Sequence, residues 1–121
     1  MLNIRIKRVY EVASADDGVR VLVDRLWPRG LSKERIQADL WLKEVAPSDA
    51  LRKWFHHDQP LWQEFKSRYF AELEQNPQPV ALLLELAAKE PVTLLYGARD
   101  PEHNQAAALA EYLQMQADKN V

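Results

Sequence analysis

Four polar residues that could bind a ligand or move a proton follow one short apolar segment near the end of the chain. The segment is Val92 to Tyr96, and the polar residues are Arg99, Asp100, His103 and Asn104. The planar fork of arginine suits phosphate or carboxylate, and a neutral histidine at a helix start can accept a proton. The spacing therefore predicts an anion site in which Asp100 and His103 are the catalytic pair.

The local pattern predicts how these side chains are held. Val92 to Tyr96 is typical of a buried strand, and Gly97 would permit a turn that a side chain would resist. Asp100-Pro101 has the form of a helix N-cap followed by the first helical residue. In open α/β sheets ligands bind where strands end and helices begin. A purely structural capping role for Asp100 explains the same pattern, so both interpretations stay open.

Two other predicted strands also lead into polar or aromatic residues. Val19 to Leu26 runs into the segment Trp27-Pro28-Arg29-Gly30, and Asp39 to Val45 forms the third predicted strand. The carboxyl ends of parallel strands share one edge of a sheet, so these segments can converge with the first. The remaining candidate substrate-binding residues at this edge come from the three predicted strands and the segments that follow them. They are Arg25, Trp27, Arg29, Lys43 and Tyr96. A solvated basic rim and a core tryptophan are the structural alternatives.

The pair His56-His57 followed by Asp58 suggests a metal cluster at first sight. Adjacent histidines in an extended link point in different directions, and the third histidine, His103, is distant in sequence. The pattern favours a helix boundary, with Asp58 capping a helix whose first turn contains Pro60. No phosphate-binding or dinucleotide glycine motif is present, and we expect neither a metal nor a cofactor.

Apolar periodicity predicts the elements that would position these residues. Alternation of Leu2, Ile4 and Ile6 with polar residues predicts an edge strand, and Ser48 is a predicted N-cap for a helix over Asp49 to Phe55. Three further helices are predicted from stripes at helical spacing: Trp62, Phe65, Tyr69 and Leu73; Leu82, Leu83, Leu86 and Ala87; Ala106, Leu109, Ala110 and Leu113. We therefore predict an α/β fold, one small domain over residues 1–121 with a central, at least partly parallel sheet of about four strands flanked by helices.

Composition excludes several classes of protein. The chain has 121 residues, a formal net charge of −2 and no cysteine, which excludes disulfides, thiolate metal sites and a cysteine nucleophile. The net charge argues against nucleic acid as a partner. The sequence shows no signal peptide and no segment able to span a membrane, so we expect a cytoplasmic protein. It does not predict the oligomeric state.

Several segments together carry a family resemblance. They are Arg20 to Lys33, Trp41 to Lys43, Ala46 to Ser48, Leu51 to Phe55 with His57-Asp58, and Leu94 to Asn104. In these segments the chain resembles the YeaO-like branch of domain-of-unknown-function family 488. The resemblance implies a small bacterial-type α/β domain and names no reaction. Gln105 stands where the YeaO-like pattern has a second histidine, which argues against a mechanism that needs both.

Three functional interpretations follow. The first is a small cytosolic enzyme that acts on a phosphate- or carboxylate-bearing small molecule at the carboxyl edge of the sheet. The second is a non-catalytic module that binds a metabolite or a nucleic-acid end at the same edge, with Trp27 stacking. The third is a structural protein that docks a partner through its tryptophans, which predicts an exposed apolar patch in place of a cleft.

Overall fold

A computed structural model describes residues 2–56 and 58–119 of the chain. Its centre is a sheet of four strands in the order β1-β4-β2-β3, and every neighbouring pair is parallel. The strands are β1 (Ile4–Arg8), β2 (Val19–Leu22), β3 (Leu40–Trp41) and β4 (Val92–Tyr96). The predicted α/β class, the parallel sheet and the edge position of the first strand are confirmed.

The parallel arrangement brings the ends of all four strands to one edge. Val92 of β4 is in register with Ile4 of β1 and with Val19 of β2, so the three strands start level. β4 lies between β1 and β2, and all five of its residues are buried. The loops that leave the carboxyl ends of β2, β3 and β4 therefore meet, as the sequence predicted.

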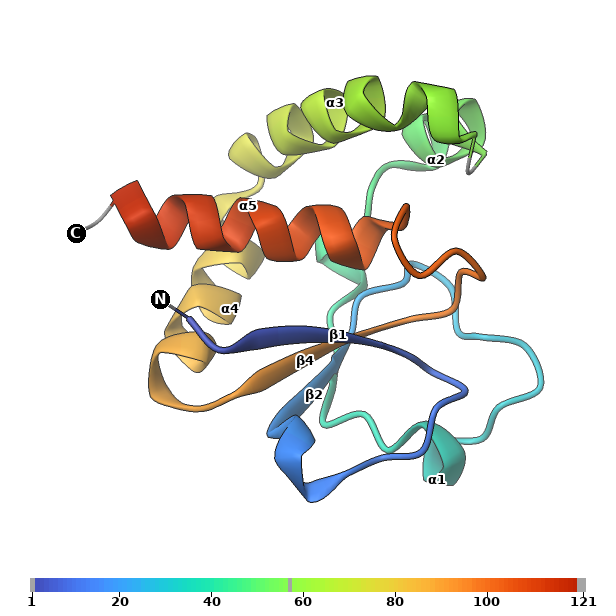
Figure 1. Cartoon of the computed structure of the whole chain (residues 1–121), viewed down its shortest axis with the longest axis vertical. Coiled ribbons are helices and arrows are strands. Elements are labelled where there is room, and N and C mark those ends of the chain that lie inside the picture. Colours follow the sequence, from blue (N-terminus) through green and yellow to red (C-terminus); the bar gives the residue numbers. More distant parts are fainter. Residues whose placement is uncertain (1, 57, 120–121) are drawn as a thin grey trace.

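Helices cover the two faces of the sheet unequally (Figure 1). The helices are α1 (Lys33–Ile36), α2 (Asp49–Phe55), α3 (Trp62–Glu74), α4 (Pro77–Lys89) and α5 (Gln105–Lys119). Short 3-10 turns are formed by Ala15–Asp17, Lys43–Val45 and Gln59–Leu61. The side chains of α2 to α5 build the main core with Val21, Val23 and Leu94 on one face. On the other face Leu22 and Leu95 pack with Val9 and with Ile36 of α1 in a small second cluster.

Side-chain caps begin two of the helices, and the cap at Ser48 confirms the prediction. The Ser48 hydroxyl accepts from the amide of Leu51 and opens α2, and the Ser32 hydroxyl accepts from the amide of Arg35 and opens α1. Glu72 of α3 accepts from both the amide and the hydroxyl of Ser48, at 2.9 and 2.6 Å. The N-terminus of α2 is thereby fixed to α3.

The start of the last helix was predicted wrongly. Asp100-Pro101 does not open α5, which begins at Gln105. The Asn104 side chain accepts from the amide of Ala107 at 2.9 Å, as an N-cap does. Asp100 accepts from two amides of its own loop and so caps a bend that ends before the helix starts. Sequence alone does not distinguish these two kinds of aspartate turn.

Other boundaries and burial assignments also differ from prediction. The second strand ends at Leu22, and the third has two residues before the chain turns into a 3-10 helix at Lys43. Leu82, predicted to face the core, is 39% exposed because it lies on the outer side of α4. Asp58 precedes the turn at Pro60 without any side-chain cap bond, and His57 lies outside the described residues.

Candidate functional site

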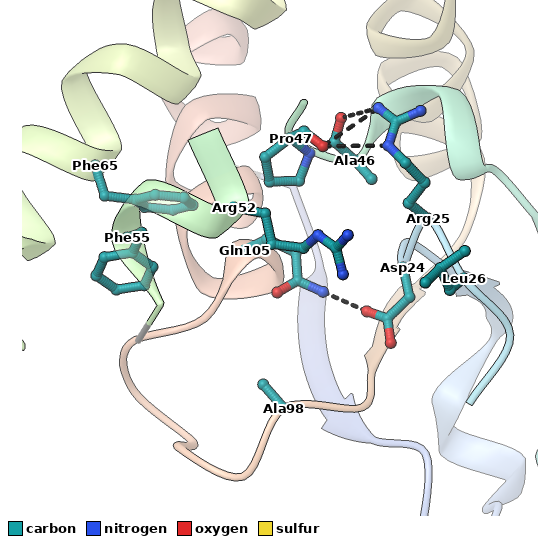
Figure 2. A pocket seen from close by; sticks show the side chains of 10 residues that line it. All are labelled: Asp24, Arg25, Leu26, Ala46, Pro47, Arg52, Phe55, Phe65, Ala98 and Gln105. Carbon is teal, nitrogen blue, oxygen red and sulfur yellow. Dashed lines mark hydrogen bonds between the residues drawn. The ribbon is translucent and has the colours of Figure 1, made fainter. Parts of the chain in front are cut away.

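A cavity of about 170 Å³ lies at the carboxyl edge of the sheet, where the loops after β2 and β4 meet α2, α3 and α5. Figure 2 shows that polar side chains from three segments point into it from one side, facing two phenylalanine rings on the other. The residues that line it are Asp24, Arg25, Leu26, Ala46, Pro47, Arg52, Phe55, Phe65, Ala98 and Gln105. Of the residues predicted from the sequence, Arg25 is the one that lines this cavity.

Asp24, two residues beyond β2, links the surrounding elements. Its Oδ2 accepts from the amide of Gly97 at 2.9 Å, and its Oδ1 accepts from Nε2 of Gln105 at the start of α5. Its backbone carbonyl accepts from Nε1 of Trp41 at 2.8 Å. Burial raises the pKa of Asp24 to about 6, against the lowering effect of these hydrogen bonds and of Arg52. Asp24 therefore changes charge near neutral pH.

Gly97 is needed for space beside Asp24. The residues with positive φ among the described glycines are Gly18 and Gly30, so Gly97 does not adopt the left-handed backbone that would require glycine. A Cβ on Gly97 would lie 2.9 Å from Oδ2 of Asp24. The predicted reason for this glycine, a turn, is replaced by the close approach of a carboxylate to the backbone.

The two arginines of the cavity are held very differently. Nη2 of Arg25 donates to the carbonyls of Ala46 and Pro47 at 3.0 and 3.2 Å, and these bonds fix its position. Nη2 of Arg52 donates to Asp49, at 3.1 Å, in an ion pair whose side chains are 46% and 61% exposed. In Figure 2 the guanidinium of Arg52 extends over the cavity towards Asp24. One guanidinium is therefore fixed by the backbone, and the other is held, among the described residues, by an exposed carboxylate.

Aromatic rings form the opposite wall of the cavity. Phe55 of α2 and Phe65 of α3 stack with their centroids 4.3 Å apart, and both are almost fully buried. Pro47 and Ala98 add apolar surface to the lining, and Leu26, which is exposed, lies beside Asp24 on the side opposite the two rings. The cavity combines an apolar wall, two cations and one carboxyl group, as small-molecule sites commonly do.

The predicted pair Asp100 and His103 lies in the loop between β4 and α5. Nδ1 of His103 is 3.0 Å from Oδ2 of Asp100, and the His103 ring meets Trp62 edge to face at 5.3 Å. Hydrogen bonds, first from the amide of Glu102 and then from the amide and ring of His103, hold the pKa of Asp100 at about 2. The side chain of Asn104 donates to the Asp100 carbonyl at 2.9 Å. This network stabilises the loop, and neither Asp100 nor His103 lines the cavity.

The other predicted residues also lie outside the cavity lining. Nε1 of Trp27 donates to the Leu31 carbonyl at 2.7 Å, and its ring packs with the second cluster. Arg29 and Arg99 are exposed, and Tyr96 is buried in the main core.

Lys43 lies over the ring of Trp41, with Nζ 5.3 Å from the centroid. Trp41 is 40% exposed, because its strand forms the edge of the sheet.

Sequence reasoning did not select Asp24, Arg52 or Gln105 as site residues. Asp24 directly follows the valine-rich segment Val19 to Val23. A polar residue at the end of such a predicted strand is expected at the carboxyl edge of the sheet, so the signal was detectable. Gln105 was noticed only as a departure from a family pattern. Arg52 lies on α2, and the packing of that helix brings it to the cavity. The local sequence around Arg52 does not predict this position.

Within residues 2–56 and 58–119, no group of three or more histidine, aspartate or glutamate side chains could hold a metal ion. No helix in that part of the chain combines the length and apolar character needed to cross a bilayer.

Comparison with known proteins gives the family. The model of the inactive DUF488-N3 subclade, DUF488-N3i, matches residues 3–121. The uncharacterised protein YeaO of Escherichia coli (strain K12) is 46% identical over 112 residues, which cover 93% of this chain and 97% of YeaO. Uncharacterised protein Rv3073c of Mycobacterium tuberculosis (strain H37Rv) is 43% identical over 92% of this chain and 93% of its own length. No solved structure matches. The chain belongs to the DUF488-N3i family and is similar to YeaO over nearly its whole length.

Proposed function

We propose that the protein is a non-catalytic binding domain that takes a small organic anion into the cavity at the carboxyl edge of its sheet. The observation that supports this most directly is that two arginines line a mostly apolar hollow: the Arg52 guanidinium extends over it, and Arg25 is held beside it by the Ala46 and Pro47 carbonyls. Guanidinium groups recognise carboxylate and phosphate, and the apolar wall favours an organic body attached to that anion.

The chemistry of the lining favours binding over catalysis. The described residues that line the cavity include no hydroxyl, thiol, imidazole or amine that could act as a nucleophile. Both carboxyl oxygens of Asp24 accept hydrogen bonds from within the protein, and the amide of Gln105 does not exchange protons. The description of the matching family as inactive agrees with this proposal.

An enzyme acting on the same class of anion is the second candidate. Its support is the contact between Asp100 and His103, since a carboxylate that orients an imidazole is a common arrangement around a general base. With a pKa of about 2, Asp100 would orient the histidine without exchanging a proton itself. The base would then be His103, one loop away from the cavity.

Thermal-shift and calorimetric screening of small carboxylates and phosphorylated metabolites tests the proposal. We expect ligands that stabilise the wild type and lose that effect in Arg52→Ala, while the distant, exposed Arg35→Ala behaves as the wild type. Loss of binding in Arg99→Ala with retention in Arg52→Ala would move the site to the β4–α5 loop. Turnover of a bound ligand that disappears in His103→Ala would establish the enzyme instead.

A further inference from the structure

Asp49 places a carboxylate oxygen between the two arginines of the cavity. Its Oδ1 lies 3.1 Å from Nη2 of Arg52 and 3.9 Å from Nε of Arg25. Asp49 is the first residue of α2, directly after the Ser48 cap, and its side chain is 61% exposed. An exposed carboxylate in this geometry gains little net stability from its ion pairs. It is therefore easily displaced by another anion.

The charges around the cavity limit the charge of a ligand. Arg52 extends towards Asp24 in the cavity, and Asp49 lies between Arg52 and Arg25 outside its lining, so two cations and two carboxyl groups are grouped there. When an anion displaces Asp49, the two arginines and an ionised Asp24 leave one positive charge. A monoanion neutralises that charge, whereas a dianion such as a phosphate monoester leaves excess negative charge beside Asp24. The site therefore favours carboxylate over phosphate.

The volume and the wall of the cavity limit the rest of the ligand. A cavity of about 150 Å³ lined by apolar side chains is large enough to hold benzene, and this one measures about 170 Å³. Phe55 and Phe65 stack on each other and are almost fully buried, so with Pro47 they make the lining apolar without offering an open aromatic face. The volume therefore fits a single six-membered ring.

We propose that the ligand is a planar monocarboxylic acid with one ring, whose carboxylate takes the place that Asp49 Oδ1 holds between Arg52 and Arg25. Asp49 is then a built-in competitor that sets the affinity of the site. This proposal rests on the proposed function and adds to it the class of ligand and the residue that opposes its binding.

Titration calorimetry with benzoate and with phenyl phosphate tests the ligand class at pH 7.5. We expect benzoate to bind the wild type more tightly than phenyl phosphate, and acetate, which lacks the ring, to bind more weakly still. Phenyl phosphate binding that depends on Arg52 and equals or exceeds benzoate binding would overturn the carboxylate class while leaving the proposed anion site intact.

The substitution Asp49→Asn tests the competitor. It keeps the size of the side chain and an oxygen that can accept from Arg52, and it removes the competing charge. We expect the affinity for benzoate to rise about twofold, a change of about 0.4 kcal/mol in binding free energy that matches the weak ion pair removed. Glu85→Gln is the matched control, because it removes an equally exposed carboxylate from α4, and it should leave the affinity unchanged.

Each failure has a distinct meaning. Equal affinity for benzoate in the wild type and Asp49→Asn would refute competition by Asp49, and the proposed binding of benzoate would still hold. Equal gains in Asp49→Asn and Glu85→Gln would show a general effect of net charge and would also overturn it. If neither the wild type nor Asp49→Asn binds any of the three probes, the ligand class and the proposed function both fall.

Discussion

The two ends of β2 carry clusters of the same residue types with opposite properties. Before and within the strand, Asp17 pairs with Arg20 at 2.5 Å, with both side chains almost completely buried, and Lys7 adds a second cation at 3.2 Å. Beyond the strand, Asp24 faces Arg25 and Arg52, whose side chains are 35% and 46% exposed beside a hollow. We call the buried group of Asp17, Arg20 and Lys7 the closed cluster, and the partly exposed group of Asp24, Arg25 and Arg52 the open cluster.

The closed cluster satisfies its charges entirely within the chain. The Arg20 guanidinium also donates to the carbonyls of Gln37 and Ile36, at 2.9 and 2.6 Å. Burial alone would raise the pKa of Asp17, but hydrogen bonds from the amide of Ser14 and from its cationic partners hold that pKa below its ordinary value. In the open cluster the effect of burial exceeds that of the hydrogen bonds and of Arg52, so the pKa of Asp24 rises. The contrast indicates a structural role for the first cluster and agrees with the binding role that we propose for the second.

The largest effect is expected from breaking the closed cluster. Arg20→Met leaves Asp17 buried without its main partner and should lower the free energy of unfolding by about 3–5 kcal/mol. Urea unfolding monitored by circular dichroism measures this loss, or shows it as absence of a cooperative transition. Arg35→Met, on the exposed side of α1, is the control. Equal small losses in both variants would contradict the structural role of the closed cluster.

The second effect concerns the pH dependence contributed by Asp24. The native state keeps a proton on Asp24 up to about pH 6, whereas an unfolded aspartate releases it near 3.8. This carboxyl group therefore contributes stability below the lower value, and that contribution is lost as pH rises through 6, amounting to about 3 kcal/mol. Asp24→Asn removes the dependence.

Urea unfolding of wild type and Asp24→Asn at pH 4 and pH 8 measures the pH dependence of stability that Asp24 contributes. The stability of the wild type relative to the variant should fall by about 2–3 kcal/mol between these pH values. In a further comparison below pH 3.8, Asp17→Asn should show the opposite sign, because the lowered pKa of Asp17 gives stability that is present above its unfolded value and lost in acid. A wild-type advantage over Asp24→Asn that is constant or grows with pH would refute the raised pKa.

A smaller effect is expected at Gly97, whose added Cβ would press on the Asp24 carboxylate. Gly97→Ala should lower the free energy of unfolding by about 2 kcal/mol, because the hydrogen bond from the amide of residue 97 to that carboxylate is lost. Gly30→Ala, at φ +76° in open space, should cost about 1 kcal/mol from backbone strain alone. In an Asp24→Ala background the Gly97 cost should largely disappear and the Gly30 cost should persist. Additive Gly97 and Asp24 effects would exclude the proposed clash.

The smallest stability effect is expected at Arg52. Its ion pair with Asp49 is exposed, so Arg52→Ala should change the free energy of unfolding by no more than about 0.5 kcal/mol. Denaturant unfolding without ligand checks this value. A loss of several kcal/mol would make Arg52 a structural residue and would weaken the contrast between the two clusters.

The fold was largely predictable from local patterns. Alternation at Leu2, Ile4 and Ile6, the buried run of Val92 to Tyr96 and the Ser48 cap each reflect short-range physics, and the structure confirms them. The helix start near Asp100 was not predictable, because aspartate before proline caps a bend as readily as a helix.

The cavity was less predictable than the fold. The edge of the sheet was anticipated, since parallel strands bring their ends together, but the arginine that reaches over it comes from α2. That placement depends on how α2 packs against α3, which is a long-range property. Asp24 and Gly97 constrain each other across 73 residues of sequence, and neither position alone reveals the contact.

The most direct test of the binding claim is a chemical-shift titration of ¹⁵N-labelled protein with benzoate. We expect saturable shifts that cluster on the amides around Asp24, Gly97 and Gln105 and on the guanidinium of Arg52, and that vanish in Arg52→Ala. No saturable shifts, or shifts centred on the loop from Arg99 to His103 that persist in Arg52→Ala, would contradict it.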